Sequence, residues 1–431
     1  MKRAGDDRRP PEPGDTAAQQ TAPEAMPAVD SRLIVREEGF RGYVGEFRRK
    51  LRSGELGSLP VVIAVIIIWT VFGSLDSAFL SAQNLSDLSQ QIVGTGMIAV
   101  GIVFVLLLGE IDLSVGSVSG LCAAIFAVLN VINGMNEWLA LLVALAGGAA
   151  VGLIHGFFFA KVGVPAFVVT LAGNLAWNGL MLQVLGTSGT VNIPSDSIVA
   201  ELYSTIFESP AAAYVTAAVG VGLFLLASLL DARRRQAARV PSRPLAEIVL
   251  RTVVIAAIAF AAAYILNQYQ GLPLALLIFL VLLVVIDFVL RRTRYGRQIF
   301  AVGGNIEGAR RAGISVPFVR MSVFTIAGTM AAVGGLFLAG QIQSASQTSG
   351  GGNLLMNVIA AAVIGGTSLF GGRGSVWSAL LGALVIGSIQ SGMNIMGVSN
   401  AVQFMITGSV LLAAVVVDSL SRRSQKAAGR A

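Results

Sequence analysis

Apolar runs separated by short polar segments fill the chain from residue 58 to residue 418. A helix needs about 20 apolar residues to cross a bilayer, and twelve runs approach that length. The sequence therefore predicts an all-α, polytopic transmembrane helix bundle of about 12 spans. The predicted spans are 58–75, 88–108, 113–133, 138–160, 165–186, 211–230, 248–266, 271–290, 320–340, 353–370, 375–395 and 400–418. The run at 353–370 is rich in small residues and ends in glycines, so it is either a full span or a re-entrant or broken helix.

The ends of the chain differ from the predicted membrane domain, 57–420. Residues 1–30 hold five of the 13 prolines, mixed charges and no apolar period, which is typical of a disordered tail. Residues 31–56 place apolar side chains at near-helical spacing among arginines, which indicates an amphipathic juxtamembrane helix or a solvated linker. Residues 421–431 are expected to form a short C-terminal tail.

Composition excludes a soluble enzyme of ordinary construction. Hydrophobic residues make up 55% of the chain and charged residues 12%, about half the charge of a soluble domain. The net charge is +7, but the basic residues lie between the apolar runs, so we expect no nucleic acid partner. If the spans alternate with the N-terminus inside, all 30 Lys and Arg residues fall in inside segments. The positive-inside rule then predicts a multi-pass inner-membrane protein with both termini in the cytoplasm.

Motifs for catalysis and cofactor binding are missing. The chain has no GxxxxGK[ST] sequence, so it carries no phosphate loop for ATP. One cysteine and one histidine make no metal site, and the GxSxG string at 116–120 lies in a predicted helix, where small residues favour close packing. Acidic residues are scarce within the spans, which disfavours an ion-coupled secondary carrier. We therefore expect a transporter subunit rather than an enzyme, with energy from a separate protein and no cofactor in this chain.

Neutral polar residues recur within the spans at helical spacing. Residues four apart share a helix face, and amides both donate and accept hydrogen bonds, as an uncharged polyhydroxylated solute requires. The alternative is hydrogen bonding between helices. The candidate residues for a translocation pathway are Asn174, Trp177, Asn178, Gln183, Asn353, Asn357, Gln390 and Asn394.

Two polar segments have sharper local signals. In 109–117 an acidic turn precedes a Gly/Ser-rich helix, and Glu110, Asp112 and Ser114 mark its start, with Asp112 or Ser114 expected to cap it. In 303–314, Asn305 is expected to cap a short surface helix that ends at Gly313. Such a helix between spans indicates docking to a cytoplasmic partner, unless it is an ordinary solvated loop.

Five strings together resemble a known family. They are 109–116 (GEIDLSVG), 164–171 (VPAFVVTL), 296–305 (from Gly296–Arg297 to Gly303–Gly304–Asn305), 309–314 (ARRAGI) and 371–376 (GGRGSV). In this order they resemble the permease subunits of bacterial ABC importers for ribose, galactose, arabinose and xylose. Glu110 and the extra pair of spans at 211–266 are most similar to the D-xylose branch.

The resemblance implies a type II importer-like permease that moves a monosaccharide, D-xylose or a similar pentose or hexose, by alternating access. It implies a homodimer, cytoplasmic ATPase subunits that bind ATP and Mg, and an extracytoplasmic sugar-binding protein. It makes 303–314 the coupling segment that seats in a cleft of the ATPase, and assigns that role to Gly304, Asn305, Ala309, Arg310 and Gly313. The pattern of the segment adds Gly303 and Glu307.

Overall fold

The computed structural model describes residues 59–427, except 241 and 243. The chain divides into two units, 1–47 and 48–431, and every described residue belongs to the second. The expected tail and juxtamembrane segment, 1–56, therefore lie outside the described residues. The last helix extends to Ala427, into the expected C-terminal tail.

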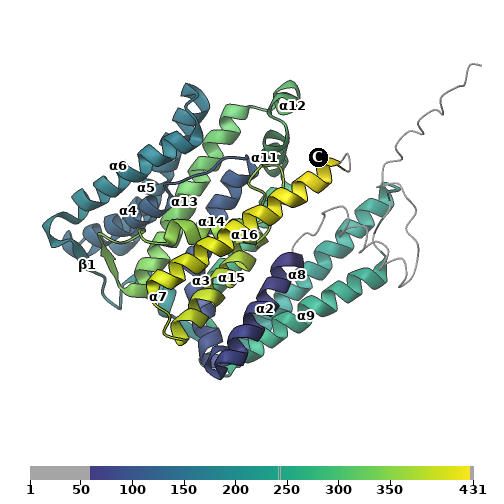
Figure 1. Cartoon of the computed structure of the whole chain (residues 1–431), viewed down its shortest axis with the longest axis horizontal. Coiled ribbons are helices and arrows are strands. Elements are labelled where there is room, and N and C mark those ends of the chain that lie inside the picture. The colour runs from purple at the N-terminus through teal and green to yellow at the C-terminus, as the bar shows by residue number, and fades with distance from the viewer. Residues whose placement is uncertain (1–58, 241, 243, 428–431) are drawn as a thin grey trace, which may run out of the picture. The chain divides into compact units, whose positions relative to one another are not determined.

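All twelve predicted apolar runs form helices, most with bounds within a few residues of those expected (Figure 1). Ten helices in the described range are long and apolar enough to cross a membrane. The bounds of the twelve are α2 Leu59–Leu75, α3 Ala82–Leu107, α4 Val115–Ala127 with a π-helical end Val128–Ile132, α5 Glu137–Phe157 with a π-helical end Phe158–Val162, α6 Ala166–Leu185, α8 Pro210–Ala237, α9 Leu245–Asn267, α10 Leu274–Arg292, α13 Val316–Ile342, α14 Leu354–Ile364, α15 Trp377–Ile395 and α16 Asn400–Ala427.

The two shorter helices are α2, with 17 residues, and α14, with 11. An 11-residue α14 is only about 16 Å long, whereas the hydrocarbon core is about 30 Å thick. The segment before α14 holds β4 (Ser344–Ser346), and the segment after it reaches the end of α3, where the N–H of Gly372 donates to the carbonyl of Leu107 at 2.9 Å. Of the two expectations for 353–370, the structure therefore agrees with the re-entrant or broken helix and not with a full helical span.

Short elements join the helices. The strand β1 (Thr190–Asn192) pairs antiparallel with β4, and β2 (Ile206–Phe207) pairs antiparallel with β3 (Leu272–Pro273). Between β1 and β2 lies the short helix α7 (Ile198–Ser204), whose first N–H donates to Glu137 Oε2 at 2.6 Å. A 3-10 turn, η1 (Ser77–Leu80), follows α2, and another, η4 (Gly186–Ser188), follows α6.

The core of the bundle is built around α13, which packs against α3, α4 and α5. Glycines let these backbones come close: a Cβ on Gly148 of α5 would lie 2.6 Å from Ala332 Cβ and against the carbonyl of Gly328. Such small-residue crossings are how membrane helices gain packing without a hydrophobic driving force. The predicted packing role of Gly116 and Gly120 is confirmed, since both abut backbone carbonyls of the 349–350 loop.

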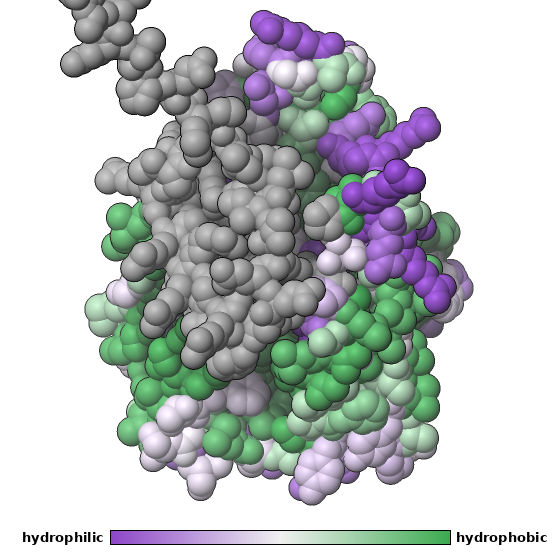
Figure 2. Space-filling model, turned by 90° about the vertical axis from the view of Figure 1, so that its right-hand side faces the viewer, coloured by the Kyte–Doolittle hydropathy of each residue, from purple (hydrophilic) through white to green (hydrophobic). Residues whose placement is uncertain are grey.

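The outer helices present apolar side chains to their surroundings. In α9, Leu250, Val253 and Ile258 are more than half exposed. Figure 2 shows hydrophilic surface gathered at one end of the face in view and a broad hydrophobic surface below it. This distribution is expected of helices that face lipid.

Candidate functional site

Two short helices between α10 and α13 form the first part of the candidate site. The helix α11 (Arg294–Gly304) is capped by Thr293, whose hydroxyl accepts from the N–H of Gly296 at 3.2 Å. Its apolar side chains at Ile299 and Val302 are buried. Sequence reasoning missed α11, although the spacing of Tyr295, Ile299 and Val302 is helical.

The helix α12 (Ile306–Arg311) has the caps that the sequence predicts. Asn305 Oδ1 accepts from the N–H of Gly308 at 2.8 Å, and Glu307 pairs with Arg310 at 2.8 Å on the exposed surface. Gly313 ends the helix with φ +78°, a conformation that glycine adopts without strain. The expected surface helix is therefore confirmed, as a second short helix after α11.

The seven residues of the coupling segment divide between two faces. Gly304, Asn305, Glu307, Arg310 and Gly313 are exposed, whereas Ala309 is buried and Gly303 is half-buried. A Cβ added at Gly304 would meet open space, but one added at Gly303 would collide with the carbonyl of Leu107. One face is thus free for a partner and the other rests on the bundle.

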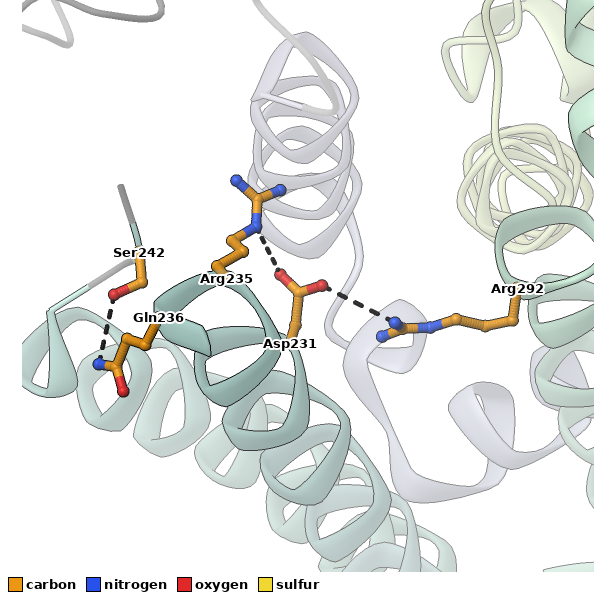
Figure 3. Close-up of polar contacts among 5 residues, drawn as sticks. All are labelled: Asp231, Arg235, Gln236, Ser242 and Arg292. Carbon is orange, nitrogen blue, oxygen red and sulfur yellow. Dashed lines mark hydrogen bonds and ion pairs between the residues drawn. The ribbon is translucent and has the colours of Figure 1, made fainter. Parts of the chain in front are cut away.

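Basic segments gather at this same end of the bundle. Asp231 near the end of α8 pairs with Arg235 at 3.0 Å and with Arg292, the last residue of α10, at 3.7 Å (Figure 3). The guanidinium of Arg291 donates to Ser375 Oγ at 3.2 Å. The hydroxyl of Ser368 donates to Asp418 of α16 at 3.4 Å. These contacts join the end of α10 to α8 and to the loop that follows α14, and they join that loop to α16.

The acidic turn between α3 and α4 also lies here. Glu110 is half-buried; burial raises the pKa of its carboxyl, and the nearby positive charge of Arg320 opposes that rise. The guanidinium of Arg320 also lies 4.3 Å from the ring centroid of Phe159, within range of a cation–π contact. Glu110 thus lies close enough to Arg320, near the start of α13, for the two charges to interact.

Asp112 and Ser114 form a buried polar cluster that the sequence did not indicate. The hydroxyl of Ser114 donates to Asp112 Oδ1 at 2.6 Å and lies 3.4 Å from Nδ1 of His155. The indole N–H of Trp177 donates to Nε2 of His155 at 2.8 Å. Because Nε2 accepts, Nδ1 carries the proton of a neutral ring. The cluster ties the start of α4 to α5 and α6.

Of the two residues expected to cap α4, Asp112 and Ser114, the cap by Ser114 is wrong. Ser114 occupies the N-cap position, but its side chain makes no capping hydrogen bond. Its hydroxyl points instead to Asp112, whose carboxylate also accepts the N–H of Ser114 at 2.8 Å. The carboxylate of Asp112, two residues earlier in the chain, thus takes the hydroxyl away from the helix end.

The eight candidate pathway residues are not brought together. Asn174 and Trp177 face inward on α6, whereas Asn178 and Gln183 are exposed on the same helix. Asn357 on α14 is buried, and its Oδ1 has no hydrogen-bond partner. On α15, Gln390 is half-buried and Asn394 is exposed, where it accepts from Gln403 of α16 at 2.9 Å. Asn353 is half-buried at the start of α14.

A cavity of about 260 Å³ lies where α4, the end of α13 and the loop before α14 meet. Its polar lining is provided by Ser119, Gln341, Ser346, Thr348 and Ser349. Hydroxyl and amide groups can donate to and accept from a small neutral solute. The sequence analysis missed this cavity; the run QIQSASQTS at 341–349 was its available signal.

Comparison with known proteins gives a consistent result. The family model "Branched-chain amino acid transport system / permease component" matches residues 84–415. The "Xylose transport system permease protein XylH" of Escherichia coli K12 is 37% identical over 375 residues, covering 86% of this chain and 94% of the relative. Its namesake from Haemophilus influenzae is 35% identical over 87% of this chain and 99% of the relative. The "Ribose import permease protein RbsC" of Escherichia coli K12 is 31% identical over 86% of this chain and 97% of the relative. No solved structure matches.

Proposed function

This chain belongs to the permease family of branched-chain amino acid transport systems, and we propose that it is the transmembrane subunit of an ATP-driven ABC importer for a monosaccharide. The observation that carries the proposal is the similarity to sugar permeases over more than four fifths of the chain. The ten helices of the described residues that are able to span a membrane and the exposed α11–α12 pair agree with it. Transport proceeds by alternating access, powered outside this chain.

D-xylose or a similar pentose or hexose is the proposed substrate. The relatives named for xylose are 35–37% identical to this chain, whereas those named for ribose are 28–31% identical. The cavity beside Ser119 and Ser349 has a largely apolar wall, with hydroxyl groups at Ser119, Thr348 and Ser349 that suit a sugar. Asn174, Asn353 and Asn357 are proposed to contribute to the pathway, since they are at least half-buried on helices next to α4.

The proposed partners follow from the position of each exposed surface. A cytoplasmic ATPase, which binds ATP and Mg, receives the exposed face of α11–α12, including Gly304, Asn305 and Arg310. A sugar-binding protein docks at the opposite end, near β1–β4 and α7. A second copy of the chain completes the pathway. The gathering of basic segments near α11–α12 supports a cytoplasmic location for that end and for both termini.

Reconstitution into proteoliposomes tests the function. Vesicles with this chain, its ATPase and a loaded sugar-binding protein should accumulate labelled D-xylose only when ATP is supplied to the ATPase side. An ionophore that collapses ion gradients should leave uptake unchanged. Uptake that persists without ATP and stops with the ionophore would instead establish an ion-coupled carrier, and labelled ribose or galactose in competition would name the sugar.

Variants of the exposed face test the coupling assignment. Gly304→Trp and Arg310→Glu should insert normally but fail to retain the ATPase during purification, because a bulky or acidic side chain then lies on the docking face. Arg234→Glu, an exposed arginine in the last turn of α8, is the matched control and should retain it. Normal retention by both α11–α12 variants would refute the assignment.

A further inference from the structure

Four glycines from three distant segments meet where the first residue of the coupling segment rests on the bundle. Gly109 follows α3, Gly303 lies in the last turn of α11, and Gly371 and Gly372 lie in the loop between α14 and α15. These four residues are called the glycine junction. The N–H of Gly372 donates to the carbonyl of Leu107, the last residue of α3, at 2.9 Å.

The contacts of the glycine junction are between backbones. A Cβ on Gly371 would lie 2.8 Å from both the nitrogen of Gly109 and the carbonyl oxygen of Gly303. A Cβ on Gly303 would collide with the carbonyl of Leu107 and lie 3.0 Å from the nitrogen of Gly372. No side-chain rotation relieves such contacts, because the atoms that would be struck belong to the main chain. The three segments therefore cannot move closer together unless main-chain atoms shift, and one backbone hydrogen bond, from Gly372 to Leu107, joins two of them.

Each segment leads to a different part of the bundle. The α11–α12 pair exposes its other face, α3 packs against α13 and α15, and the 365–376 loop connects the broken helix α14 to α15. The bond from Arg291 to Ser375, at 3.2 Å, ties the same loop to the end of α10. Movement at the exposed face thus has a closely packed backbone route to α3 and the α14–α15 loop, beside the contacts that α11 makes with α10 and α13.

We propose that the glycine junction transmits the movement of α11–α12 to α3 and the α14–α15 loop, with Gly303 as the positioning residue that keeps the three backbones in contact. The inference rests on the proposed function. Packed interfaces switch between arrangements rather than deform gradually. Because the backbones in the junction touch directly, a small displacement of α11 must be matched by a displacement of α3 or of the α14–α15 loop. Gly303 touches neither ATP nor sugar; it acts through its neighbours.

The test measures the number of ATP molecules hydrolysed per sugar imported, in the reconstituted complex. In Gly303→Ala the added methyl pushes α11 away from α3 while the exposed face stays intact. The ATPase should remain bound and hydrolyse ATP, but sugar uptake should fall, raising the ratio roughly tenfold, a common size for coupling between sites. Stimulation of hydrolysis by the loaded binding protein should also be lost. Mere loss of folded protein lowers both rates together and leaves the ratio unchanged.

Two further variants keep the test decisive. Gly374→Ala would meet only side-chain ends, Thr367 Cγ2 at 2.7 Å and Leu107 Cδ2 at 3.1 Å, so it should fold and raise the ratio less. Gly220→Ala on α8 adds a methyl to open space and should keep the wild-type ratio. If Gly303→Ala fails to fold, Gly374→Ala carries the test. A wild-type ratio in every variant that folds would overturn the inference.

The outcome separates the inference from the function on which it rests. Gly304→Trp on the exposed face should lose the ATPase itself, whereas Gly303→Ala should keep the ATPase and lose the coupling. Wild-type protein that imports no sugar with ATP would refute the proposed function. Wild-type protein that imports sugar, together with fully coupled Gly303→Ala, would refute only the role of the junction.

Discussion

The α3–α5–α13 core and the α8–α9 hairpin are equally apolar in sequence, yet they behave differently in the structure. The predicted span windows of α3 and α13 are 83% and 72% buried, whereas those of α8 and α9 are 11% and 17% buried. Glycines in the core touch neighbouring backbones, but Gly220 and Gly222 of α8 face open space. Hydropathy therefore locates the membrane helices, while close approach of their backbones decides which of them form the scaffold.

The largest expected effect comes from enlarging a core glycine. In Gly328→Leu the new side chain on α13 would strike the carbonyl of Gly148 and the backbone of Gly152 on α5. The cost should exceed the ~1–3 kcal/mol of ordinary overpacking, because main-chain atoms cannot repack. We expect little folded protein by size-exclusion chromatography in detergent. Gly220→Leu on α8 is the control and should elute as wild type; equal behaviour of the two would erase the distinction between core and hairpin.

Local signals were readable where the chain makes its own contacts. Asn305 and Gly313 bracket α12 as expected, because capping and chain reversal involve only nearby residues. The cap at Ser114 failed although its partner is also nearby, because the hydroxyl donates to Asp112 instead of accepting from the first turn of α4. The contact of the same hydroxyl with His155, which comes from another helix, could not be read from the sequence. The cavity beside Ser119 and the glycine junction could not be predicted either, because each is assembled from segments that lie far apart in the sequence.

Removal of the hairpin should have an intermediate effect. The ends of the α8–α9 hairpin are held together, since Ile206 pairs with Pro273 and Phe207 with Leu272. A two-residue turn can join such strands. We expect a variant with 208–271 replaced by Asn-Gly to insert and to keep ATP-driven uptake, because the loss of two spans leaves the orientation of every later span unchanged. Its melting temperature should be slightly lower, since the contacts of the hairpin with the bundle are lost.

The matched control removes α8 alone, which reverses the orientation of every later span. That variant should lose uptake and place α11–α12 on the wrong side, as judged by cysteine labelling from outside the vesicle. If the two-helix deletion also loses uptake while remaining monodisperse, the hairpin contributes to transport. The distinction between a transporting core and a peripheral hairpin would then be wrong.

The smallest expected effect concerns the link between the hairpin and the end of α10. Asp231 is 44% exposed and Arg292 is 34% exposed, and the pair is separated by 3.7 Å (Figure 3). Exposed ion pairs contribute only about 0.2–1 kcal/mol, because water and salt screen both charges. Asp231→Asn should therefore shift the melting temperature little and leave uptake and its ATP requirement unchanged. A loss of uptake as large as that expected for Gly303→Ala would instead mean that the hairpin, through Arg292, takes part in positioning the coupling segment.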